Sequence, residues 1–324
     1  MLTLERSWVW DFWLADDGES YHAFFLHAPT SLGDELRRHR AARIGHAVSA
    51  DLVSWTVLEE TPFGPGPEGS FDASATWTGS VVRGDDGLWR MFYTGSRFLD
   101  AEPAMANIET VGVAVSSDLL TWEKQPGPVV SADPRWYETW GTSGWKEEAW
   151  RDPWVFRDPD GRGWHMLVTA RSTDGALEDR GVIGHAVSTD LATWEVRQPL
   201  SRPGAGFAHL EVPQVELVDG RWLLLFSSTN DSMTREHALS HPGAGTWAVA
   251  VEDPTRSLDV SAALPLTTDS LYSGRIVRDR DGNWTLLAFH NSDESGAFVG
   301  GISDPIAIDV VDGRAVLRHD VPAA

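Results

Sequence analysis

The segments IGHAVSADLVSW (44–55), VGVAVSSDLLTW (111–122) and IGHAVSTDLATW (183–194) are three copies of one pattern. In each copy an alternating strand runs into Ser-x-Asp-Leu, a turn whose Asp accepts backbone N–H groups, and a Trp opens the next strand. Similarity that recurs along a chain indicates a repeat architecture rather than unrelated hairpins. The sequence therefore predicts one hairpin unit that is used several times.

A strand rich in aromatic and β-branched residues precedes each copy, and two further strands of this type extend the series to five. A shorter strand lies before each of these, and the turn between the two ends in Asp-Gly, a strong hairpin signal. The five shorter strands are VWDFWL (9–14), TWTGSVV (76–82), RDPWVF (151–156), EVPQVEL (211–217) and YSGRIV (272–277). Five units of about four strands each result, and no helical period interrupts them.

Units of this size favour a five-bladed β-propeller, because radial repetition leaves few exposed sheet edges. A parallel β-helix needs much shorter repeats, and a β-sandwich does not need five equal ones. The stretches 97–110, 133–150 and 230–246 are expected to be longer loops, and no linker-like composition divides the chain. We therefore expect an all-β fold with one domain over residues 1–324.

The composition narrows the classes of partner. The 48 acidic and 26 basic residues give a net charge of −22, which repels phosphate backbones and anionic lipid but leaves a neutral substrate unaffected. Nucleic acid and membrane are therefore not expected partners. Cys is absent, which excludes disulfide and thiolate chemistry. The first residues, MLTLERSWVWDFW, lack the pattern of a signal peptide, so we expect a cytoplasmic protein.

The candidate chemistry lies in the five short strands, because the first strand of each propeller blade lines the central channel. These strands contribute three carboxylates: Asp11, Asp152 and Glu211. Their neutral or basic neighbours are Thr78, Ser80, Ser273 and Arg275. Like charges in a partly desolvated site raise at least one pKa, and a carboxylic acid that stays protonated near neutrality is what a general acid needs. Glycoside cleavage uses two carboxylates in such distinct states.

Each carboxylate also has an ordinary structural explanation. Asp11 at a strand start is typical of a turn acceptor, and Asp152 in Arg-Asp-Pro is compatible with an ion pair to Arg151. Glu211 lies between apolar neighbours, where burial without a role is costly. The occurrence of all three at matched places in three blades favours the catalytic interpretation.

The segments VWDFW, WTGS, RDP and LEVPQ, in that order, resemble the five-bladed propeller enzymes of glycoside hydrolase families 32 and 68, which include invertases, inulinases, levanases and levansucrases. The related family 43 of arabinofuranosidases and xylosidases shares this fold. Family 32 usually has Asn-Asp-Pro-Asn at the nucleophile, whereas Trp10-Asp11-Phe12-Trp13 is closer to the Val-Trp-Asp pattern of family 68. Where family 32 shows Glu-Cys-Pro at the acid, this chain has Glu211-Val212-Pro213.

The resemblance implies Asp11 as nucleophile, Asp152 as transition-state stabiliser, and Glu211 as acid and then base. Retention of anomeric configuration would follow, with the nucleophile and acid carboxyls about 5–5.5 Å apart; an inverting family 43 enzyme would need roughly 6.5–9.5 Å. Family 32 members generally carry a C-terminal β-sandwich, and the last blade here closes near DGRAVLRHDV (312–321). The resemblance therefore implies a propeller without the sandwich.

Substrate-binding residues are expected beside these motifs. Four Trp residues are candidates both for the walls of a furanose pocket and for packing between blades: Trp10, Trp13, Trp77 and Trp150. Ser80 and Arg151 complete the candidate set, with Arg151 holding Asp152 or Glu211 ionised through a charge-assisted bond.

No metal or cofactor is expected at the site. The histidines of the repeated HAVS segments, His46 and His185, belong to a structural hairpin, and the chain shows no spacing typical of zinc ligands. Proton transfer and carboxylate attack suffice for glycoside cleavage, so no redox or organic cofactor is implied.

The first hypothesis is thus a retaining β-fructofuranoside hydrolase or fructosyltransferase that acts on sucrose, fructan or a related oligosaccharide. The second is a family 43-like furanosidase for arabinose or xylose linkages. The third is a propeller that binds carbohydrate or protein without catalysis. Three intact carboxylates argue against the third, because a binding site has no need to keep three adjacent acids.

Overall fold

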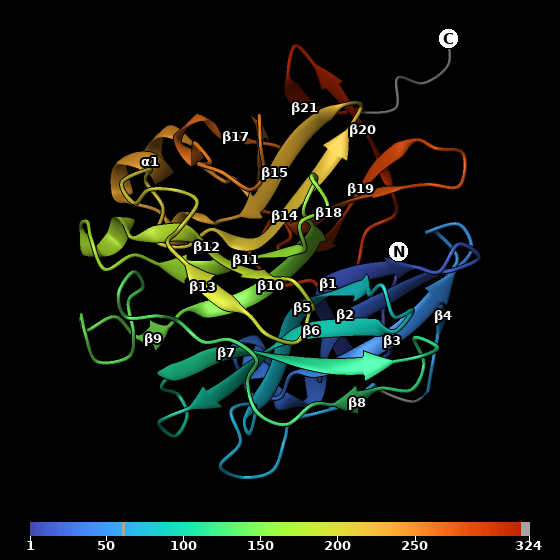
Figure 1. Ribbon diagram of the computed structural model, residues 1–324, viewed down its shortest axis with the longest axis horizontal. Helices are drawn as coiled ribbons and strands as arrows, with labels where there is room; N and C mark the ends of the chain where they lie inside the picture. Colours follow the sequence, from blue (N-terminus) through green and yellow to red (C-terminus); the bar gives the residue numbers. More distant parts are fainter. Residues whose placement is uncertain (60–61, 319–324) are drawn as a thin grey trace.

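The computed structural model describes residues 1–59 and 62–318, which form five antiparallel sheets arranged around a common centre (Figure 1). In each sheet the strands follow one another in chain order as a meander. The prediction of an all-β, five-bladed β-propeller is confirmed. Within the described ranges, no helix combines the length and the apolar character that crossing a bilayer requires.

The strands of the first two blades lie in the first half of the chain. Blade one contains β1 (Ser7–Asp16), β2 (Tyr21–Pro29), β3 (Arg43–Ser49) and β4 (Thr56–Val57). Blade two contains β5 (Ala75–Arg83), β6 (Trp89–Phe98), β7 (Asn107–Ser116), β8 (Glu123–Lys124) and β9 (Glu147–Glu148). The short strand β9 pairs in parallel with β7, outside the meander.

The other three blades have four strands each. Blade three contains β10 (Trp150–Arg157), β11 (Trp164–Arg171), β12 (Gly181–Ser188) and β13 (Glu195–Arg197). Blade four contains β14 (Glu211–Val218), β15 (Arg221–Ser227), β16 (Thr246–Val251) and β17 (Leu264–Pro265). Blade five contains β18 (Leu271–Arg278), β19 (Trp284–His290), β20 (Ile306–Val311) and β21 (Arg314–Leu317). The end of the expected closing segment, residues 319–321, lies outside the described residues.

The repeated hairpins fold as their sequence predicts. Asp51, Asp118 and Asp190 each accept the backbone N–H groups two and three residues further on. The Leu that follows each Asp has a positive φ, 63° at Leu52 and 64° at Leu119. These local bonds explain why the turn recurs with the same residues, since Asp supplies the acceptor that the tight turn needs.

All three expected loops are shorter than predicted, and the end of the stretch 133–150 belongs to β9 and β10. β6 and β7 continue as a long hairpin, so the loop over 97–110 is reduced to the residues between Phe98 and Asn107. The segment 230–246 contains η4 (Asn230–Ser232) and a short helix, α1 (Arg235–Ser240), whose first turn is capped by Thr234. The remaining short 3₁₀ helices are η1 (Thr30–Leu32), η2 (Glu35–His39), η3 (Leu177–Asp179) and η5 (Val260–Ala262).

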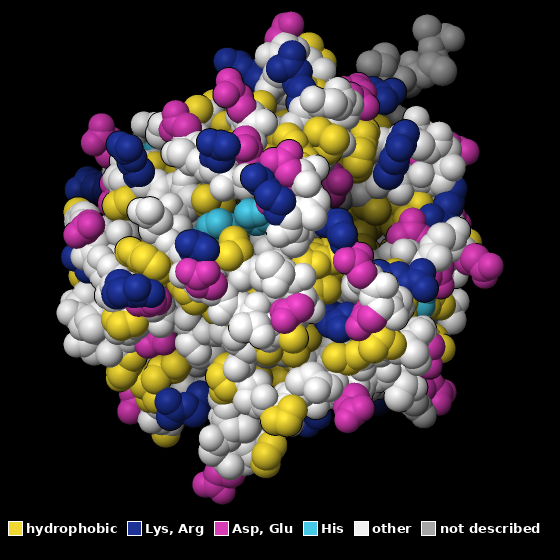
Figure 2. All heavy atoms as spheres, in the orientation of Figure 1, with side chains coloured by type: hydrophobic (Ala, Val, Ile, Leu, Met, Phe, Trp, Pro, Cys, Tyr) yellow, Lys and Arg dark blue, Asp and Glu magenta, His cyan; other side chains and the backbone are white. Residues whose placement is uncertain are grey.

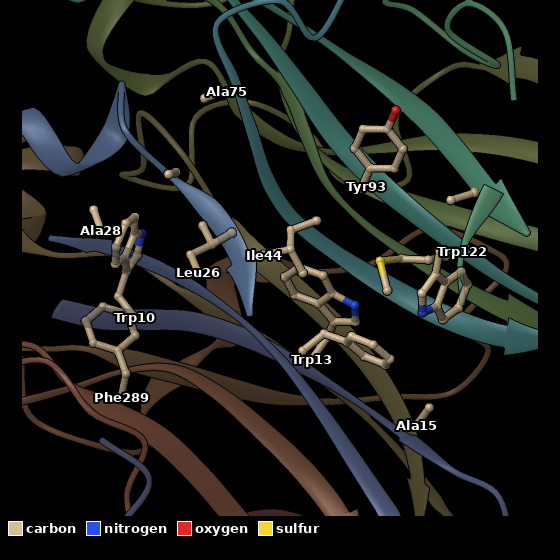
Figure 3. Close-up of a cluster of buried hydrophobic side chains, with 14 of the residues drawn as sticks. Trp10, Trp13, Ala15, Leu26, Ala28, Ile44, Ala75, Tyr93, Trp122 and Phe289 are labelled. Atoms are coloured by element: carbon tan, nitrogen blue, oxygen red, sulfur yellow. The ribbon is translucent and has the colours of Figure 1, made fainter. Parts of the chain in front are cut away.

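The ring closes where the start of the chain meets blade five. Leu2 exchanges two backbone hydrogen bonds of 2.9 Å with Ile302. A buried apolar cluster joins blade one to blades two and five, and Figure 3 shows Trp13, Ile44, Tyr93 and Trp122 together in it. Because each blade packs on its neighbours in this way, the inner strands are held at fixed positions around the axis.

Each of the five inner strands carries a β-bulge at the same place. The pairing shifts by one residue after Trp10 in β1, after Trp77 in β5, and at the matching points of β10, β14 and β18. A bulge leaves its extra residue out of the ladder and re-aims its side chain. In each blade the bulge therefore takes one residue out of the regular alternation of side chains. These residues are Asp11, Thr78, Asp152, Val212 and Ser273.

The residue after the bulge position explains three of the sequence motifs, RDP, LEVPQ and WTGS. Pro153 and Pro213 follow the bulge residues of blades three and four, where no N–H is needed for the ladder. Gly79 follows Thr78 in blade two, and a Cβ there would collide with the Phe92 carbonyl oxygen. The small residue in WTGS is therefore required by the close approach of β5 to β6.

We predict that Gly79→Ala destabilises the protein by about 1–3 kcal/mol, because the collision is with backbone and cannot be relieved by a side-chain rotation. Urea denaturation with circular dichroism measures the change. An unfolding midpoint equal to that of the wild type would show that β5 tolerates a side chain at this point.

Candidate active site

A cavity of about 880 Å³ lies at the end of the axis where the inner strands begin. Its walls include the bulge residue and the residue before it from the first four blades: Trp10, Asp11, Trp77, Thr78, Arg151, Asp152, Glu211 and Val212. The structure therefore brings the three predicted carboxylates into one cavity, although they are far apart in the sequence.

Asp11 is held by hydroxyl groups from the two neighbouring blades. Thr78 Oγ1 donates to one carboxylate oxygen at 2.9 Å, and Ser273 Oγ donates to the other at 2.5 Å. Burial raises the pKa of Asp11 above its ordinary value, and these two hydrogen bonds oppose the rise. The hydroxyls fix the orientation of the carboxylate, which a nucleophile needs.

Asp152 is bound by groups of blades three and four. Its Oδ2 accepts hydrogen bonds from Thr169 Oγ1 at 2.8 Å and from the Val212 N–H at 3.1 Å. Its backbone has a φ of 57°, and its N–H donates to Thr94 Oγ1. Burial raises the pKa of Asp152 to about 6, although the Arg151 guanidinium opposes this rise.

Glu211 has the most polar surroundings of the three. Arg151 Nη2 donates to Oε1 at 2.7 Å, and the Tyr272 hydroxyl donates to Oε2 at 2.5 Å. Burial raises the pKa of Glu211, but Arg151, His209 and the Tyr272 hydroxyl outweigh burial, so the net pKa lies below its ordinary value. The elevated pKa values expected from crowded carboxylates therefore fall on Asp11 and Asp152, whereas Glu211 is ionised in the free protein.

Several residues near these carboxylates were not predicted. Tyr272 occupies the place in the fifth inner strand that Arg151 and Glu211 occupy in theirs, so a comparison of matched positions would have identified it. Arg38 is nearly buried against the rings of Trp10 and Phe298, and its charge opposes the raised pKa of Asp11. Further unpredicted residues line the cavity: His39, Glu109, Glu147 and His209.

The predicted substrate-binding residues divide into two groups. Trp10, Trp77 and Arg151 line the cavity, as expected for residues that contact a substrate. Trp13, Trp150 and Ser80 do not line it, so the expectation for these three was wrong. They belong to a different part of the structure, the packed interior of the blades.

The reason is that the bulges at Asp11, Thr78 and Asp152 interrupt the alternation of side chains, so a residue two positions away no longer shares their face. Trp13 is fully buried and stacks on Phe24, and Trp150 is fully buried with its ring edge-on to Tyr137. Ser80 is also buried, where its Oγ accepts the Val155 N–H and joins blades two and three. These side chains stabilise the propeller and present no surface to a ligand in the cavity.

Arg275 is buried on the axis. Its Nη1 donates to the Pro213 carbonyl at 2.8 Å, and its guanidinium lies 5.1 Å from the centre of the Trp154 ring. Burial lowers the pKa of Arg275 to about 10, and the charges of Asp152 and Asp11 oppose that decrease. Arg275 is therefore a buried cation that partly compensates the carboxylates.

The rim of the cavity is formed by two loops. Residues 34–40 of blade one and 99–106 of blade two meet through an ion pair of 2.9 Å between Arg37 and Glu102. Arg40 adds a hydrogen bond of 2.7 Å to the Asp100 carbonyl. In the part of the chain that the structure describes, no group of three or more His, Cys, Asp or Glu side chains is arranged to hold a metal ion.

The fold and the site together define a class: five-bladed β-propellers that gather carboxylates at one end of the axis. Residues 14–253 match the model of the "Glycosyl hydrolases family 32 N-terminal domain". This range includes Asp152 and Glu211, and it begins three residues after Asp11. The chain belongs to glycosyl hydrolase family 32.

Comparisons with individual proteins agree with this assignment. The raffinose invertase of Escherichia coli is 26% identical over 314 residues, which cover 92% of this chain and 59% of that protein. The sucrose-6-phosphate hydrolase of Bacillus subtilis (strain 168) is 32% identical over 193 residues, 59% of this chain and 34% of that protein. The chain thus spans less than two thirds of the length of either curated relative.

Solved structures show the same fold. The Microbacterium saccharophilum K-1 β-fructofuranosidase catalytic domain matches with a TM-score of 0.77 and 18% sequence identity, over 97% of this chain and 81% of that chain. At this level of identity the comparison supports the propeller architecture.

The raised pKa of Asp152 predicts a measurable effect on stability. Because the folded pKa of about 6 lies above the ordinary 3.8, the folded state binds more protons between these values, and stability falls as the pH rises through this window. Asp152→Asn removes the buried charge, so we expect it to be more stable than the wild type at pH 7 by on the order of 1–3 kcal/mol. Urea denaturation measures this difference, which should disappear near pH 4. Equal stability of Asp152→Asn and the wild type at pH 7 would contradict a raised pKa of Asp152.

Proposed function

We propose that this cavity cleaves or transfers β-fructofuranosyl groups with retention of configuration. The observation that carries the proposal is the meeting of Asp11, Asp152 and Glu211 in one cavity, each held by a different set of hydrogen bonds. Membership of family 32 and the names of the relatives, an invertase and a sucrose-6-phosphate hydrolase, support a fructoside as substrate. The same names favour this function over an arabinofuranosidase or xylosidase.

In the first step a carboxylate oxygen of Asp11 attacks the anomeric carbon while the bond to the leaving oxygen breaks. Glu211 gives its proton to that oxygen, so the leaving sugar departs neutral. The hydroxyls of Thr78 and Ser273 orient Asp11 for this attack. Asp152 accepts hydrogen bonds from the sugar hydroxyls and stabilises the positive charge that develops on the ring.

In the second step the ionised Glu211 takes a proton from the acceptor hydroxyl, whose oxygen attacks the anomeric carbon and releases Asp11. Water as acceptor gives hydrolysis, and a sugar hydroxyl gives transfer. Because Arg151 and Tyr272 stabilise the ionised form of Glu211, the free protein is closer to the state needed for the second step.

A carbohydrate partner also agrees with the charge of the molecule. Figure 2 shows acidic and basic side chains interspersed over the visible face rather than separated by sign. With a net charge of −22, a neutral sugar approaches without the repulsion that a nucleic acid or an anionic membrane would meet.

We predict that Asp11→Ala and Glu211→Ala each lower turnover by several orders of magnitude, on the scale of about 10³-fold or more, because each removes a group that makes or breaks a bond. The assay incubates each protein with sucrose, inulin, levan and nitrophenyl arabinofuranosides. Proton and carbon NMR follow the released sugar and its first anomeric form.

Circular dichroism and melting temperature serve as controls that each variant is folded. Fructose or fructosyl products with retention are expected from the wild type. Arabinose release would favour the alternative furanosidase, and near-normal activity in either folded variant would rule out the catalytic assignment.

A further inference from the structure

Arg151 contacts four carboxylates at once. Its Nη1 lies 2.9 Å from Glu109 Oε2 and 3.3 Å from Glu147 Oε1, while its Nη2 lies 2.7 Å from Glu211 Oε1. Its Nε is 3.6 Å from Asp152 Oδ2. Nη2 and Nε of the guanidinium thus face two proposed catalytic groups, Glu211 and Asp152, and Nη1 faces two other glutamates.

This division affects the proposed acid. Glu211 must carry a proton in the first step, yet Arg151 and Tyr272 both favour its ionised form. A negative charge on the far side of Arg151 offsets part of the attraction that Glu211 experiences, and it also repels an ionised Glu211. A negative charge on Glu109 or Glu147, which contact Nη1, therefore makes the pKa of Glu211 higher than it would be with Arg151 alone.

The two glutamates differ in their surroundings. Burial raises the pKa of Glu109 to about 8, and this side chain is only 1% exposed. For Glu147 burial also raises the pKa, but Arg151, His209 and Lys146 outweigh it, and the result is a lowered pKa. Nearby cations therefore favour the ionised form of Glu147, whereas burial opposes ionisation of Glu109.

Glu147 is held in place by the backbone. It lies on β9, which pairs in parallel with β7 so that Glu147 is opposite Asn107. The side chain of Asn107 donates to Glu109 Oε1 at 2.9 Å, so β7 fixes both glutamates relative to Arg151. His209 Nε2 lies 3.1 Å from Glu147 Oε1, without the alignment of a hydrogen bond.

We propose that Glu147 is a positioning residue that sets the protonation of Glu211 through their shared contact with Arg151. The inference rests on the proposed role of Glu211 as acid and base. The other titratable or charged groups that face Glu211 come from five elements or loops and remain unchanged in the test: Asp11, His39, Arg151, Asp152, His209 and Tyr272.

The first test is the pH profile of kcat/KM for Glu147→Gln. Loss of the charge lets Arg151 hold Glu211 more strongly as an anion, so the alkaline limb should move to lower pH. On the acidic side we expect kcat/KM of the variant to stay within about threefold of the wild type. Across the alkaline limb we expect it to fall by about tenfold, because removing one nearby charge has an effect of this order. A purely structural role would lower activity equally at every pH.

Two matched variants serve as controls. Glu148→Gln changes the neighbouring residue of β9, whose carboxylate accepts the Trp140 N–H instead of contacting Arg151, and it should keep the wild-type profile. Glu147→Asp retains the charge and should restore most of the profile. A shift in Glu148→Gln as large as that in Glu147→Gln would overturn the proposal.

The second test does not depend on turnover. Carbon NMR of the side-chain carboxyl of Glu211, assigned with Glu211→Gln, gives the titration midpoint in the wild type and in Glu147→Gln. A lower midpoint in the variant supports the coupling even if no fructoside is cleaved, in which case only the proposed function fails. An equal or higher midpoint overturns the inference, whether or not the enzyme is active.

Discussion

The site depends on one constraint, the β-bulge. Each inner strand inserts one extra residue at the matching position near its start. In a regular strand, alternate side chains point to opposite faces of the blade. The bulge interrupts this alternation, so two consecutive residues, such as Trp10 and Asp11, both reach the cavity. At three of the five bulges the backbone has a positive φ, which is costly for a residue with a side chain: Asp152, Val212 and Ser273. Hydrogen bonds to the freed N–H groups, such as Ser273 to Ser227 Oγ, offset part of that cost.

From this shared geometry the three carboxylates acquire different properties through their partners. Asp11 receives neutral hydroxyls, Asp152 receives a hydroxyl and a backbone N–H, and Glu211 receives a guanidinium and a phenol. Only the last set includes a direct cationic donor, and only Glu211 has a lowered pKa. Asp11 and Asp152 are bulge residues, whereas Glu211 precedes the bulge of its strand, so neighbouring positions at the start of the inner strands can give distinct roles to chemically similar groups.

The features that could be predicted from the sequence are those set by neighbouring residues along the chain, such as turns and strand alternation. Repeated turns and strand alternation predicted five blades, and the strand starts predicted three carboxylates that lie in one cavity: Asp11, Asp152 and Glu211. The assignment of Trp13 and Trp150 to the pocket was wrong, because facing depends on where the bulge interrupts the alternation, and a count along the strand does not reveal this. Glu147 was missed for another reason. Its position comes from a parallel pairing of β9 with β7, a non-local contact that no short motif encodes.

The rim is built by weaker interactions than the floor. Arg37 and Glu102, which join the two rim loops, have side chains 47% and 42% exposed, and exposed ion pairs contribute little to stability. The groups that hold Asp11 and Asp152 are buried and lie on strands of the same or a neighbouring blade, so they move only if the propeller itself deforms. The floor of the cavity is therefore held more rigidly than its rim, which the loops 34–40 and 99–106 form.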